Sequence, residues 1–159
     1  MKRVQGSADV RLIECVNPVQ KKWRVRWGVE TQPGGETSYM EEEFSGKPSI
    51  ETVKQLILGW MNKRIDERII SGFTYDGNPV WLSQENQFNY KSALDLAVQT
   101  QGQTLPVKFK FGTDDEPVYV IFETLPKLQD FYTKAFTFIQ QTLNEGWQQK
   151  DSVDFNAYV

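Results

Sequence analysis

Hydrophobic and polar residues alternate along the N-terminal part of the chain, which is typical of β-strands with one buried face. Three segments show this pattern: residues 9–16, 22–30 and 36–44. In the second segment both tryptophans share one face, while Arg24 and Arg26 share the other. Because turn-forming residues separate the segments, we expect a three-stranded antiparallel meander. It would form an N-terminal module of residues 1–47, of which about the first eight are loose.

Beyond this module, hydrophobic residues recur at spacings of three and four, which predicts amphipathic helices. Three helices are expected, and each follows a capping hydroxyl: Ser49, Ser83 and Thr124. The first is predicted to end at Gly72, the second near Gln99 and the third near Gly146. In the second helix, Phe88 is expected to face inward. Together these helices belong to a second α+β domain, residues 48–159.

Two short β-hairpins are predicted between the helices. They pair residues 73–75 with residues 80–82, and residues 104–111 with residues 117–123. Asp76-Gly77 between β-forming residues is a strong signal for the first hairpin turn. The predicted order is therefore β-β-β-α-ββ-α-ββ-α, which is an α+β fold.

The composition matters chiefly for the chemistry it removes. The chain has no histidine and a single cysteine, Cys15, so it lacks the commonest general base and the usual zinc ligands. One cysteine cannot close an intrachain disulfide, and we expect it to behave as a small hydrophobic residue. These observations favour a non-enzymatic protein without a cofactor or a metal.

Charge and hydropathy also restrict the partners. The net charge is −3, from 18 basic and 21 acidic residues, which gives no overall field to attract a nucleic acid or an anionic membrane. No stretch approaches the roughly 18 apolar residues of a membrane helix. We expect synthesis in the cytoplasm, because the charged N-terminus is not followed by an apolar run.

Two alternative functions remain open at the level of sequence. Residues 21–27 interleave basic and aromatic side chains, as in grooves that bind nucleic acid, although alternation directs the two kinds to opposite faces. A carbohydrate hydrolase would need two carboxylates a few ångströms apart, and the acidic residues 41–43 and 114–116 are the candidates. The second of these clusters could instead bind a hard cation through its carboxylates.

One stretch resembles a known family. Residues 68–83, which read RIISGFTYDGNPVWLS, and the later Gln87-Phe-Asn-Tyr90 resemble a domain of unknown function recurring in bacteriophage and prophage tail and tail-fibre-associated proteins. The likeness covers residues 49–159 and includes the closing segment 153–157. It implies a structural, adaptor or assembly protein that contacts other virion or assembly proteins. Self-association and incorporation into the virion are open alternatives.

The residues proposed as an interaction surface are basic side chains of the second strand and aromatic side chains near the ends of elements. They are Arg24, Arg26, Tyr75, Trp81, Trp147 and Tyr158. Tryptophan, tyrosine and arginine are enriched where protein interfaces are strongest. Packing in the core is the alternative for each aromatic residue, and it is the more frequent role of such side chains.

Overall fold

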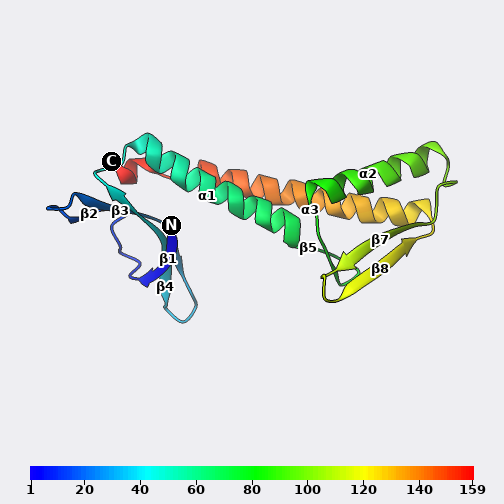
Figure 1. Ribbon diagram of the computed structural model, residues 1–159, viewed down its shortest axis with the longest axis horizontal. Coiled ribbons are helices and arrows are strands. Elements are labelled where there is room, and N and C mark those ends of the chain that lie inside the picture. The colour runs from blue at the N-terminus through cyan, green and yellow to red at the C-terminus, as the bar shows by residue number, and fades with distance from the viewer. The chain divides into compact units, whose positions relative to one another are not determined.

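A computed structural model describes the whole chain, Met1–Val159 (Figure 1). The fold is α+β, with three α-helices and antiparallel strands, as the sequence predicts. The chain divides into two compact units. Unit 1 comprises Met1–Trp60 and Ser152–Val159, and unit 2 comprises Met61–Asp151. The expected module boundary at residues 47 and 48 lies just before α1 (Ile50–Ser71), whereas the units divide within that helix.

Unit 1 is built on a four-stranded antiparallel sheet in the order β1-β4-β3-β2. Its strands are β1 (Lys2–Gly6), β2 (Ile13–Asn17), β3 (Lys22–Thr31) and β4 (Thr37–Ser45). The three predicted strands are present as consecutive neighbours, but the first residues are not loose. They form β1, which pairs with β4 in the register Lys2↔Glu41 to Gly6↔Thr37. This pairing depends on β4, which lies more than 30 residues further along the chain, so no local sequence pattern predicts it.

The hydrophobic core of unit 1 lies between β3 and the first part of α1. Val25 and Val53 are completely buried, and Trp27 meets Trp60 edge to face with ring centroids 6.1 Å apart. Such aromatic contacts add to the stabilisation from buried area. The C-terminal 3₁₀ turn (Phe155–Tyr158) belongs to this unit, because the buried Tyr158 hydroxyl donates to the Arg26 carbonyl oxygen at 3.0 Å.

Unit 2 follows the predicted alternation of hairpins and helices. Its further elements are β5 (Phe73–Tyr75), β6 (Asn78–Val80), α2 (Gln84–Gln99), β7 (Val107–Gly112), β8 (Pro117–Phe122) and α3 (Leu125–Asp151). β6 begins at Asn78 and not at residue 80, because Asp76 and Gly77, with φ of 49° and 78°, make a tight two-residue turn. None of the three helices combines the length and apolarity of a membrane-spanning segment.

Two helix predictions need correction. α3 does not end near Gly146: it continues to Asp151, and Gly146 is buried where a Cβ would lie 2.3 Å from Ile65 Cδ1. The glycine therefore permits close packing within a helix. Phe88 does not face inward and is 70% exposed, because the inward stripe of α2 runs through Tyr90 and Ala97. Positions two residues apart lie on opposite sides of a helix.

Aromatic side chains fill the core of unit 2, where α2 packs alongside α3 (Figure 1). Phe131 of α3 is completely buried at the centre. Its ring centroid lies 5.0–6.4 Å from those of six other rings: Phe73, Tyr75, Tyr90, Phe109, Phe111 and Phe122. This aromatic cluster joins the two hairpins of the unit to α2 and α3.

Candidate functional site

Two parts of the molecule concentrate chemically distinctive side chains: a charged face of the sheet in unit 1 and a groove in unit 2. The charged face follows from the register of β3 and β4, which sets Arg24 opposite Glu43 and Arg26 opposite Glu41. Directly opposed residues of an antiparallel pair share a face, so opposite charges meet.

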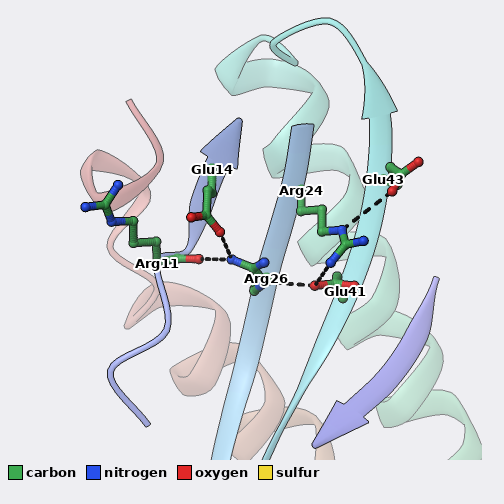
Figure 2. Close-up of polar contacts among 6 residues, drawn as sticks. All are labelled: Arg11, Glu14, Arg24, Arg26, Glu41 and Glu43. Carbon is green, nitrogen blue, oxygen red and sulfur yellow. Dashed lines mark hydrogen bonds and ion pairs between the residues drawn. The ribbon is translucent and has the colours of Figure 1, made fainter. Parts of the chain in front are cut away.

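Arg26 lies at the centre of this charged face (Figure 2). Its Nε donates to Glu41 Oε2 at 2.8 Å, and its Nη1 donates at 2.9 Å to both Glu14 Oε2 and the Arg11 carbonyl oxygen. Arg26 is 6% exposed and Glu41 is 4% exposed. Burial acts to lower the pKa of Arg26, but the hydrogen bonds to the two glutamates outweigh it and leave the pKa raised.

The other basic side chains of β3 are also paired. Arg24 Nη1 lies 3.7 Å from Glu41 Oε2 and Arg24 Nε lies 3.5 Å from Glu43 Oε2 (Figure 2). Lys22 Nζ lies 3.1 Å from Glu43 Oε1. The hydrogen bond from Lys22 is the main cause of the lowered pKa of Glu43. A phosphate approaching this strand would compete with acids already in place, so the arrangement favours a structural role over binding of nucleic acid.

The two acidic segments belong to different units and differ in exposure. Glu41 is buried and paired with arginines, whereas residues 114–116 lie exposed at the tip of the β7–β8 hairpin. No group of three or more acidic or cysteine side chains is placed to hold a metal ion. Glu41, Glu42 and Glu43 border one small cavity, where Glu41 pairs with Arg26, Glu42 with the N-terminal amino group and Glu43 with Lys22.

Three of the six residues proposed as an interaction surface are interior residues. Arg26, Tyr75 and Tyr158 are 6%, 4% and 5% exposed, so they do not present a surface to a partner. Each has found a polar partner inside the protein that satisfies it: the Tyr75 hydroxyl, for example, donates to Asp130 Oδ2 at 2.9 Å. Burial and the carboxylate of Asp130 raise the pKa of Tyr75 to about 12.

The other three residues reach solvent. Trp81 is 57% exposed and Trp147 is 49% exposed, while the Arg24 side chain is 37% exposed between its acidic partners. Trp147 lies on α3. Trp81 follows β6 and borders the groove, so it is both exposed and part of a cavity.

The groove has a volume of about 660 Å³, and β6, α2 and β7 line it. The buried or half-buried residues of its lining are Val80, Asn86, Tyr90, Phe109, Phe111 and Gly112, and the exposed ones include Trp81, Asn89, Lys108 and Lys110. A pocket with an apolar lining and a few polar groups is the usual form of a binding site.

Local hydrogen bonds hold the border of the groove in place. The Ser83 side chain caps α2 by accepting from the Asn86 N–H at 3.2 Å, and Asn86 Nδ2 donates to the Trp81 carbonyl oxygen at 2.7 Å. The backbone at Trp81 is therefore tied to the first turn of α2. On the β7 side of the groove, Lys110 Nζ lies 3.1 Å from Asp114 Oδ1, and Lys108 Nζ lies 5.5 Å from the centroid of the Tyr119 ring.

The sequence pattern predicted Trp81 as a candidate contact residue, but it predicted neither Lys108 and Lys110 as part of the site nor the groove itself. A signal exists in the strand Val107–Gly112, where Lys108 and Lys110 alternate with buried phenylalanines. Alternation shows that the lysines share the outer face, but not that a cavity runs along the strand.

Comparison with family models, with curated proteins and with solved structures gave no match to this chain.

Proposed function

We propose that this protein is a non-enzymatic binding protein that contacts other proteins through the groove of unit 2. The observation that carries the proposal is the half-exposed Trp81 beside an apolar groove of about 660 Å³. Exposed tryptophans next to such pockets supply much of the affinity of protein interfaces. Its position is fixed by the capped start of α2, so little ordering is needed when a partner binds.

The ionisable groups also support a binding role. General acids and bases work best with a pKa near the working pH. In this protein, the surroundings of eight ionisable groups move their pKa values further from neutral pH. The pKa is lowered for Glu43 and Asp130, and it is raised for Arg26, Tyr75, Tyr90, Lys91, Lys134 and Tyr158. Such groups keep their usual protonation state and serve as structural partners.

A bacteriophage or prophage setting is part of this proposal and rests on the resemblance of residues 68–90. In that setting the partner would be another virion or assembly protein. This part is an argument from association, since a fold or a family does not by itself fix a function.

The proposal is tested by offering the purified chain three classes of ligand in parallel: a displayed library of peptides and protein fragments, a glycan array, and labelled single- and double-stranded DNA at two salt concentrations. We expect ligands from the protein library alone. Replacement Trp81→Ala should weaken their binding by about tenfold or more. Trp147→Ala is the matched control, because both side chains are about half exposed.

Three outcomes would contradict the proposal. The first is salt-sensitive binding of DNA without any protein ligand, which would favour the basic residues 21–27. The second is recognition or hydrolysis of a glycan. The third is a set of protein ligands that tolerate Trp81→Ala but not Trp147→Ala, which would move the binding surface from the groove to α3.

A further inference from the structure

The strand β7 has one edge without a strand partner. It pairs with β8 in a two-stranded sheet, and no other strand is hydrogen-bonded to it. The consecutive residues 108–114 all line the groove, so the groove runs along this open edge, and residues 79–81 of the neighbouring β6 segment line its other side. An unpaired edge presents a row of backbone N–H and C=O groups that can accept another strand.

The register shows which backbone groups face the groove. Thr113 N–H donates to the Glu116 carbonyl oxygen at 3.2 Å, and hydrogen-bonded pairs alternate with non-bonded pairs along an antiparallel ladder. Counting back along the hairpin, Phe111 and Phe109 bond across to β8. The backbone groups of Lys108, Lys110 and Gly112 therefore point away from β8. Pro117 lies opposite Gly112, and its nitrogen also points away from the partner strand. The lack of an N–H at this proline therefore removes no hydrogen bond between β7 and β8.

We infer that the groove binds an extended acidic segment of a partner protein, which adds as a strand to the open edge of β7. This inference rests on the proposed function and specifies how its binding site works. Main-chain hydrogen bonds supply affinity in this mode of recognition, and alternate side chains supply specificity.

The charge of the edge identifies the added strand as acidic. Lys108 and Lys110 share the outer face of β7, so residues opposite them on an added strand would lie on that same face. Lys108 has no acidic side chain paired with it, and the partner of Lys110 is the fully exposed Asp114, which a ligand carboxylate can replace. The ligand residue between two acidic ones would face the apolar lining. The expected motif is acidic–apolar–acidic.

Charge and backbone geometry argue against two alternatives: pairing of β7 with a second copy of itself, and addition of a strand to the edge of β6. Two copies of β7 paired across a twofold axis would bring lysines of like charge together, which is unfavourable. The edge of β6 is blocked: the two-residue turn pairs Tyr75 with Asn78, so the next residue, Pro79, faces outward and has no N–H. The open edge of β7 is therefore better suited than the edge of β6 to a foreign acidic strand.

The test uses the full chain and a blocked peptide of alternating Glu and Val, with a Lys/Val peptide and a scrambled Glu/Val peptide as controls. Binding is followed by titration, and amide hydrogen exchange is followed residue by residue. We expect the alternating acidic peptide to bind about tenfold more tightly than the basic one, because two ion pairs are gained. Bound peptide should slow exchange at Lys108, Lys110 and Gly112 but not at Phe109 and Phe111, which β8 already protects.

Charge reversal provides the second arm. The double variant Lys108→Glu/Lys110→Glu should reverse the preference between the acidic and the basic peptide. Lys63→Glu is the control, since this exposed lysine of α1 is not part of the groove lining. Methylation of those peptide amides that face β7 should abolish binding, and methylation of the other amides should not.

The outcomes separate this inference from the proposed function. If the library yields protein ligands sensitive to Trp81→Ala but exchange at Lys108 and Lys110 does not change, strand addition is overturned and the binding role stands. The inference also fails if the basic or scrambled peptide binds as well as the alternating acidic one. If no protein or peptide binds in either experiment, both proposals are wrong.

Discussion

The two units solve the problem of a stable interior in different ways. In unit 1, the central residues of β3, Val25 to Trp27, are buried on both faces of the sheet, and the interior includes the ion pair of Arg26 with Glu41. In unit 2, rings packed around Phe131 fill the interior. The comparison teaches that burial alone does not define a hydrophobic core. A charged residue can lie in a hydrophobic core if several partners bond to it. The stability of that core then depends on keeping all of these partners.

This difference predicts different responses to the loss of one side chain. Aromatic packing depends on volume and on contacts with many neighbours, each of which contributes little. A buried ion pair depends on a few charged partners, and removing one of them leaves a buried charge that is poorly compensated. Variants in the two units should therefore lose stability for different physical reasons: lost packing in unit 2 and a poorly compensated buried charge in unit 1.

The largest effect is expected in the aromatic cluster. Phe131→Ala should destabilise the protein by about 4 kcal/mol, because it removes a fully buried ring and leaves a cavity. Chemical denaturation monitored by circular dichroism measures the change. The half-exposed Phe136 on the same helix is the control, and its replacement by Ala should cost much less. Equal losses for the two variants would show that Phe131 does not organise the unit.

The next effect concerns the buried ion pair of unit 1. Arg26→Met should cost about 3 kcal/mol, because the buried Glu41 loses its hydrogen-bonded arginine and keeps only the more distant Arg24, 3.7 Å away. The double variant Arg26→Met/Glu41→Leu should recover much of this loss, since no buried charge remains. Arg24→Met, at the more exposed position, should cost about 1 kcal/mol or less. A double variant as unstable as Arg26→Met would contradict the role of charge.

Alkaline pH tests one buried tyrosine in each unit. Burial raises the pKa of Tyr90 in unit 2 and of Tyr158 in unit 1 to about 12, from an ordinary value of 10.0. Stability from each neutral phenol is complete below pH 10 and is lost as the pH rises through 12, because the unfolded chain ionises first. Each contributes about 2–3 kcal/mol over this range. Denaturation midpoints measured from pH 9 to pH 12 check the effect, which Tyr90→Phe should reduce.

The smallest effect should be the same in both units. Ser49 accepts from the Thr52 N–H at the start of α1, and Ser83 accepts from the Asn86 N–H at the start of α2. Replacement of either serine by Ala should cost about 1 kcal/mol. Because a cap depends on neighbours within one helical turn, the two losses should agree even though the cores differ. A much larger loss for Ser83→Ala would show that the border of the groove depends on this cap.

Much of the architecture follows from short patterns in the chain. The alternation in residues 22–30 predicts β3, the capping serines predict the starts of two helices, and Asp76-Gly77 predicts the first hairpin turn. The candidate site was less predictable. Trp81 was predicted as a candidate contact residue and is exposed, but Tyr75 and Tyr158 could not be recognised as interior residues, because exposure depends on what other segments cover.

The sequence by itself determined the elements whose cause is local: strands from alternation, helices from periodicity, and boundaries from caps and glycines. The tertiary structure decided the pairing of β1 with β4, the burial of Arg26, and the groove between β6, α2 and β7. The physical reason is the range of the interactions. A turn or a cap is set within a few residues, whereas pairing, burial and cavities arise only when distant segments meet and exclude water.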